Sequence, residues 1–142
     1  MHSAWRERLQ QQGYRVTRPR RALLTVLSRS RRPLSARELQ ARAQAHHEKL
    51  GLVTVYRTLE ILERLGLVRR IHSEGLCHTF MAASPGHRHA ITCERCSMVV
   101  EFDGDDLCLQ TSQVEAKTGY RVSGHWLQLA GVCPTCRAES RE

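Results

Sequence analysis

Features typical of exported and membrane proteins are missing from this sequence of 142 residues. The segment from Met1 to Gln12 is polar and lacks the apolar stretch of a secretory signal. No apolar run approaches the roughly 20 residues that a transmembrane helix needs. Internal repeats and low-complexity tracts are absent as well. We therefore expect a cytoplasmic protein that has no membrane partner.

Lysine is scarce, because only Lys49 and Lys117 occur among 22 basic residues and arginine supplies the rest. The charge is also unevenly placed. Residues 1–80 hold 16 Lys and Arg against 6 Asp and Glu, a net charge of +10, whereas residues 81–142 hold 6 against 8, a net charge of −2. This asymmetry predicts that the N-terminal part binds a polyanion such as nucleic acid.

The N-terminal part has the helical pattern of a DNA-binding domain. Capping residues and apolar periodicity predict helices over residues 4–12, 17–27, 35–48 and 51–66. Ser3 and Thr17 are expected N-caps, and Ser35 with Glu38 forms a capping box. Two strands, 67–72 and 76–81, flank a Ser-Glu-Gly turn. Helices followed by such a hairpin predict a winged helix whose last helix enters the major groove of DNA.

The remaining residues read as a small α/β unit. A hairpin is expected over 87–102, a helix capped by Asp105 over 106–118, and a strand over 120–130, with Gly119 ending the helix. The predicted fold class is therefore α+β. We expect a winged helix-turn-helix domain at 1–82, a hinge at 83–86, and an α/β domain at 87–142.

Two Cys-x-x-Cys pairs, Cys93/Cys96 and Cys133/Cys136, predict a structural zinc site. The two-residue gap lets both sulfurs of a pair face one ion, and two pairs complete a tetrahedron. The alternatives are two disulfides or merely buried thiols. The absence of a secretory segment favours a reducing compartment and hence the metal. A closed four-cysteine site keeps no open position for catalysis.

A second set of metal-ligating side chains surrounds the expected hinge. Five of them fall within 18 residues and two follow later: His72, Cys77, His78, His87, His89, Glu101 and His125. Two histidines two positions apart on a strand share a face, and the later strand can bring a third histidine to them. No residue stands out as a general base, so we do not expect an enzyme.

Taken together, these motifs resemble the ferric uptake regulator (Fur) superfamily of bacterial metal-responsive repressors. The resemblance rests on the segments 13–20 (GYRVTRPR), 54–59 (TVYRTL), 86–96 (GHRHAITCERC), 100–102 (VEF), His125 and Cys133–Cys136. It implies a homodimer formed by the C-terminal domain and metal-gated binding to an AT-rich palindromic operator.

The resemblance also assigns residues to DNA. Thr54, Tyr56 and Arg57 lie where the family contacts its operator, and a tyrosine ring suits thymine methyl groups while arginine suits guanine or phosphate. Arg15 matches the family position that reaches into the minor groove. Arg18 and Arg20 are expected to contact phosphates, with plain surface charge as the alternative.

The choice of sensed metal rests on departures from the iron-sensing pattern. The run His87-Arg88-His89-Ala90 lacks two histidines of the iron sensors' quartet, and Arg32-Pro33-Leu34 stands where they have another histidine. Cys77, in the run 76–80 (LCHTF), resembles the zinc uptake regulators, and a thiolate favours Zn²⁺ over Mn²⁺ or Fe²⁺.

Four further assignments follow from the family positions. His72 is preferred to His78 as a ligand, and Glu101 matches a carboxylate ligand. Cys108 stands where relatives often carry a glutamate that completes a site with His87, His89 and His125, so that it either ligates or packs. Ser97 replaces a glycine after the first cysteine pair, which costs strain if φ is positive there.

The prediction is thus a zinc-responsive DNA-binding repressor of metal uptake genes. One alternative is a regulator that responds to Mn²⁺ or Fe²⁺. Another is a redox or peroxide sensor that oxidises Cys77 or Cys108.

Overall fold

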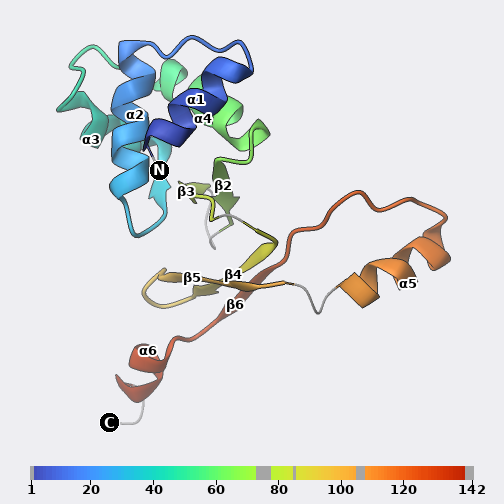
Figure 1. Cartoon of the computed structure of the whole chain (residues 1–142). Helices are drawn as coiled ribbons and strands as arrows, with labels where there is room; N and C mark the ends of the chain where they lie inside the picture. Colours follow the sequence, from blue (N-terminus) through green and yellow to red (C-terminus); the bar gives the residue numbers. More distant parts are fainter. Residues whose placement is uncertain (1, 73–77, 85, 105–107, 140–142) are drawn as a thin grey trace. The chain divides into compact units, whose positions relative to one another are not determined.

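The computed structural model describes residues 2–72, 78–84, 86–104 and 108–139 (Figure 1). The chain divides into two compact units, Met1–Ala83 and Ser84–Glu142. The predicted α+β class is confirmed, since helices and two small sheets make up these units.

Four helices and a three-stranded sheet build the N-terminal unit. The helices are α1 (His2–Gln11), α2 (Arg18–Arg29), α3 (Ala36–Gln44) and α4 (Leu52–Arg64). The strands β1 (Leu34–Ser35), β2 (Val68–Ile71) and β3 (Thr79–Ala82) form an antiparallel sheet in the order β1-β3-β2. Most leucines of the helices are buried in one core against this sheet, where Leu34 pairs with Phe80. This is the expected winged helix, with β1 as an added strand too short to show a sequence pattern.

Side-chain caps set where α2 and α3 begin. Thr17 accepts a hydrogen bond from the Arg20 amide at 3.5 Å and starts α2. At α3, Ser35 Oγ accepts from the Glu38 amide at 3.2 Å, and the Ser35 amide donates to the Glu38 carboxylate at 2.8 Å. Both expected caps are confirmed. The expected cap at Ser3 is wrong, because α1 already begins at His2.

The third helix ends at Gln44, four residues earlier than the sequence predicts. The chain turns there because the side-chain amides of Gln40 and Gln44 both donate to the Leu50 carbonyl, at 2.9 and 3.3 Å. These bonds hold Leu50 in the core, where it is 2% exposed. Because these bonds join residues up to ten positions apart, apolar periodicity within the helix could not predict where α3 ends.

The C-terminal unit is a three-stranded sheet with two helices. Its elements are β4 (Arg88–Cys93), β5 (Val99–Asp103), α5 (Cys108–Thr118), β6 (Gln128–Gly131) and α6 (Pro134–Ala138). The order is β5-β4-β6, and β6 runs parallel to the central strand β4. The expected hairpin is confirmed, and Gly119 ends α5 with φ of 75°.

The long strand expected over 120–130 is wrong for most of its length, because regular pairing begins only at Gln128. Helix α6, which Cys133 caps through its sulfur, was not expected at all. The expected cap Asp105 and the wing turn 73–75 lie outside the described residues.

The capping box allows a test with a matched serine. Ser35→Ala is expected to lower the free energy of unfolding by about 0.5–2 kcal/mol, because the Glu38 amide at the start of α3 loses its acceptor. Ser3→Ala should have almost no effect, since Ser3 lies inside α1 and is exposed. Urea unfolding of both variants measures this, and equal losses would contradict the assignment.

The same box predicts a pH dependence. Its hydrogen bond from the Ser35 amide holds the Glu38 pKa below the ordinary value of 4.5. A lowered carboxyl pKa contributes stability above the unfolded pKa that is lost as the pH falls through the folded pKa. Glu38→Gln removes the titrating carboxylate and should therefore lose less stability on acidification than the wild type, which urea unfolding at neutral and acidic pH measures.

Candidate metal centres and DNA-binding surface

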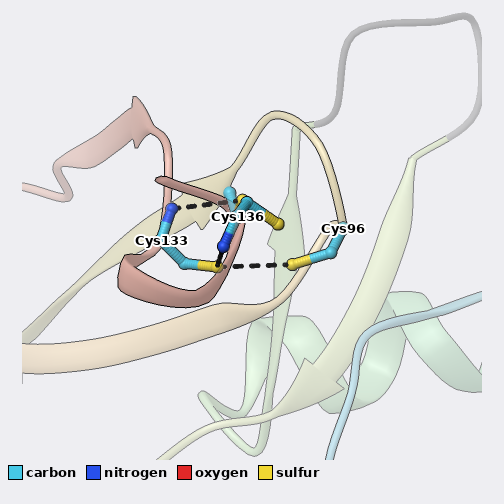
Figure 2. A group of neighbouring side chains, drawn as sticks. Cys96, Cys133 and Cys136 are labelled. Atoms are coloured by element: carbon cyan, nitrogen blue, oxygen red, sulfur yellow. Dashed lines mark hydrogen bonds between the residues drawn. The ribbon is translucent and has the colours of Figure 1, made fainter. Parts of the chain in front are cut away.

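The four paired cysteines come together at the end of β4. Cys93 ends that strand, Cys96 follows in the turn to β5, and Cys133 and Cys136 begin α6. Their four sulfur atoms lie within 4.8 Å of one another. Figure 2 shows the sulfur of Cys96 facing that of Cys133, at 3.7 Å. All four are free thiols, since a disulfide requires about 2.05 Å. A set of four sulfurs with this spacing suits a tetrahedral ion.

Backbone hydrogen bonds shape each half of this cysteine centre. In the first pair, the Ser97 amide donates to the Cys93 carbonyl at 2.9 Å, and Ser97 has φ of 58°. The strain anticipated for a serine in this tight turn is therefore present. The Cys133 amide donates to the Cys93 sulfur at 3.3 Å and the Cys136 amide to the Cys133 sulfur at 3.4 Å. Amides aimed at sulfur stabilise thiolates and orient them.

Two of the thiols, Cys93 and Cys136, differ in their readiness to ionise. Backbone amides, first that of Cys96 and then that of Cys133, lower the pKa of Cys93 to about 6. The neighbouring Cys133 side chain, followed by burial, raises the pKa of Cys136 to about 12. Four negative sulfurs this close repel one another, so a divalent cation is needed to deprotonate the whole set. Metal binding here must therefore release protons.

Three histidines gather at the opposite end of β4. The ligand nitrogens of His87, His89 and His125 lie within 4.8 Å of one another, and the two Nε2 atoms of His87 and His125 are 2.9 Å apart. Parallel pairing explains this, because Ala90 pairs with Gln128 and His87 and His125 each stand three residues earlier. His89 is fully buried, and its Nδ1 accepts a hydrogen bond from the Leu127 amide at 3.2 Å. Three converging imidazoles form a ready site for a transition metal.

The structure does not bring Glu101 to these histidines. In the antiparallel pair β4–β5, Glu101 stands opposite Ala90, whereas His89 stands opposite Phe102. Paired residues share a face and neighbours alternate, so Glu101 and His89 point to opposite faces of the sheet. The expectation that Glu101 joins the histidine centre does not fit this register and is corrected.

His72 and His78, which the sequence presents as alternatives, lie side by side. Their ring centroids are 5.0 Å apart. The reason is the wing register, since Ile71 pairs with Thr79 and the two histidines are the next opposed positions. The sequence favours His72, and the structure places His78 beside it; the equal spacing of the two histidines from the glycine of the Ser-Glu-Gly turn is the sequence signal for this pairing. Cys77 and the side chain of Cys108 lie outside the described residues, although Cys108 is the first residue of α5.

Helix α4, which the sequence predicts to contact DNA, presents one face to solvent. Val55, Leu59 and Leu62 are buried, whereas Tyr56 is 53% exposed and Arg57 is exposed. Val53, one turn before Tyr56, is 65% exposed and was not expected in the contact set. An exposed valine beside an exposed tyrosine forms an apolar surface that suits thymine methyl groups. Thr54 is half-buried, and its carbonyl accepts from the Thr58 hydroxyl at 2.7 Å.

The arginines before and within α2 differ in how far other groups hold their side chains. Arg15 and Arg18 are exposed. Arg20 donates to the Arg15 carbonyl at 2.6 Å, and its guanidinium lies 5.9 Å from the centroid of the Tyr14 ring. Arg20 therefore braces the loop that carries Arg15, and retains further donors for a phosphate. In the described part of the chain, no helix has the length and apolar character required to cross a bilayer.

Comparisons with known proteins agree on one family. The sequence profile of the ferric uptake regulator family matches residues 11–130. The ferric uptake regulation protein of Synechococcus elongatus is 31% identical over 132 residues, which cover 91% of this chain and 90% of that protein. Its counterpart in Escherichia coli K12 is 34% identical over 126 residues, covering 88% and 85%.

Solved structures give the same result. The Vibrio cholerae ferric uptake regulator has a TM-score of 0.67 and 32% identity, covering 90% of this chain and 98% of that one. A zinc uptake regulator solved with zinc and DNA has a TM-score of 0.82, covering 99% and 95%. At 21% identity that likeness shows a shared fold alone.

The cysteine centre predicts the effect of removing one sulfur. Cys96→Ser should lose a tightly bound Zn²⁺ and unfold the C-terminal unit, because structural zinc contributes about 10–16 kcal/mol of apparent binding energy. Zinc analysis and thermal unfolding measure both. Ser112→Ala, an exposed position in α5, is the control and should keep the metal. A folded Cys96→Ser chain without metal would contradict a structural role.

Proposed function

Because this chain belongs to the ferric uptake regulator family, we propose that it is a zinc-responsive member: a DNA-binding repressor whose affinity for its operator is raised when the histidine centre binds Zn²⁺. Membership of the family supports the broader function, which is that of a metal-responsive regulator. The convergence of His87, His89 and His125 carries the proposal.

The ligand chemistry favours zinc. Neutral imidazoles suit Zn²⁺, whereas Mn²⁺ and Mg²⁺ favour carboxylate oxygens. With Glu101 on the other face of the sheet, the described residues supply nitrogen ligands only. We propose Cys108 as the fourth ligand, because it begins α5 four residues after Gly104 and a thiolate strengthens the preference for zinc.

A second role for the C-terminal unit is dimerisation. Val100, Ile91 and Leu129 stand side by side across the three strands, because Ile91 pairs with both others. They are 54%, 38% and 41% exposed. An apolar row of this kind on one sheet face supports self-association. A symmetric pair would present two α4 helices to successive turns of a palindromic duplex.

The switch would act through local order. His87 is the fourth residue of the C-terminal unit, so an ion that ties it to His89 and His125 restricts the start of this unit, where the chain arrives from the N-terminal unit. In a dimer, this restriction favours the arrangement that operator DNA also selects, and zinc shifts the population toward it.

The proposed DNA surface is tested with two variants of α4 and with a control variant that removes the same charge as one of them. Tyr56→Ala and Arg57→Ala should each weaken binding to a duplex selected by the protein from a random pool by about 1–3 kcal/mol, without changing zinc content. Arg121→Ala removes the same charge from an exposed position of the C-terminal unit and should change binding little. Fluorescence anisotropy at fixed salt measures all three. Unaltered binding by both α4 variants would place the DNA surface elsewhere.

The sensor is tested at its buried ligand. His89→Ala should keep one Zn²⁺ at the cysteines and remain dimeric, but lose the zinc-dependent increase in DNA affinity. His46→Ala, an exposed histidine after α3, should respond like the wild type. Titrations with Zn²⁺, Mn²⁺ and Fe²⁺ on the cysteine-loaded protein compare the metals. A normal zinc response in His89→Ala would refute the histidine sensor, and an equal response to Mn²⁺ would refute zinc selectivity.

A further inference from the structure

We infer that Gly104 is a positioning residue of the histidine centre, because only a residue without a side chain leaves room for an ion on His89. The inference rests on the proposed zinc site at His87, His89 and His125. Gly104 is buried and follows the last residue of β5.

The sheet register aims position 104 at the histidines. Arg88 pairs with Asp103, so the next opposed pair is His87 and Gly104. A hydrogen bond agrees with this pairing, since the Gly104 amide donates to the His87 carbonyl at 3.0 Å. Opposed residues share a face of the sheet, and His89 lies on that face as well. A side chain at 104 would therefore point into the histidine centre.

The distances show what such a side chain would meet. A Cβ at position 104 would stand 2.3 Å from His89 Nε2 and 2.6 Å from His87 Cδ2. Zinc–imidazole bonds are about 2.0–2.1 Å long. A methyl group there would fall within the coordination shell of His89 Nε2, and an ion on that nitrogen could not coexist with it. The φ of Gly104 is not positive, so the requirement is for space and not for backbone conformation.

His89 cannot easily move out of the way. Its ring is 0% exposed, and its Nδ1 is tied to the Leu127 amide. Phe102 and Trp126 flank it, with ring centroids 5.6 and 6.1 Å away. Gly104 is itself fixed by its hydrogen bond to His87. Any substitution at 104 must therefore displace the imidazole that binds the ion.

Gly124 offers a matched control. It directly precedes His125, it lacks a positive φ, and a Cβ there would meet nothing within 4 Å. Gly124→Ala thus makes the same chemical change beside the same centre without entering it.

The first experiment titrates Zn²⁺ into the full chain with its cysteine centre already loaded, against a competing chelator. Gly104→Ala should bind the second zinc at least about 100-fold more weakly than the wild type, at or beyond the upper end of the usual effect of groups around a metal site. Gly124→Ala should bind it as the wild type does. Wild-type affinity in Gly104→Ala would overturn the role of Gly104 alone. A wild-type chain that takes up no second zinc would overturn the proposed function and this inference with it.

A second experiment needs no metal at the histidine centre. Gly104→Ala should lower the melting temperature in the wild-type background. It should lower it much less in the His89→Ala background, where the buried colliding ring is gone and only the exposed ring of His87 must shift. Equal losses in the two backgrounds would show that the alanine disturbs something other than His89 and would overturn the inference.

Discussion

The parallel pairing of β6 with β4 is the constraint on which both metal centres depend. In a parallel pair, like ends of the two strands meet, so residues that precede β6 reach the start of β4 and residues that follow it reach the end. The register from Ala90–Gln128 to Cys93–Gly131 thereby sets His125 beside His87, and Cys133 beside Cys93. A shift of this register by one residue would turn the side chains of β6 to the other face and would separate the ligands of both centres.

The two ends of β4 offer different chemistry. At the cysteine end, backbone amides point at sulfur and one thiol has its pKa lowered to about 6, which suits permanent occupation by a structural ion. At the histidine end, His89 is buried while His87 is exposed, so the site is anchored on one side and open on the other. Because an ion at the cysteines holds the end of β6, it also keeps His125 in register. An ion at the cysteines would thus be a precondition for the ion that we propose at the histidines.

Local signals in the sequence predicted local structure well. The cap at Thr17, the box at Ser35 and Glu38, and the strained turn at Ser97 each involve residues two to four positions apart, and each is present. The cysteine pairs were equally readable, because their spacing directly reflects the geometry of the ion.

What the sequence could not supply was pairing between distant strands. The sequence predicts a strand over 120–130 that is longer than β6, because apolar composition does not reveal where a parallel ladder starts. The sequence cannot separate Glu101 from the histidines, because the face of the sheet on which it lies depends on register alone. For the same reason the pairing of His72 with His78 and the closeness of Gly104 to His89 emerged only from the structure.

Reciprocal linkage tests the central claim most directly. The measurement is the Zn²⁺ affinity of the histidine centre, with the cysteine centre loaded, in the absence and presence of saturating operator duplex. If the ion and the DNA select the same arrangement, DNA must tighten zinc binding by the same factor by which zinc tightens DNA binding. A zinc affinity that is unchanged by DNA would contradict the account.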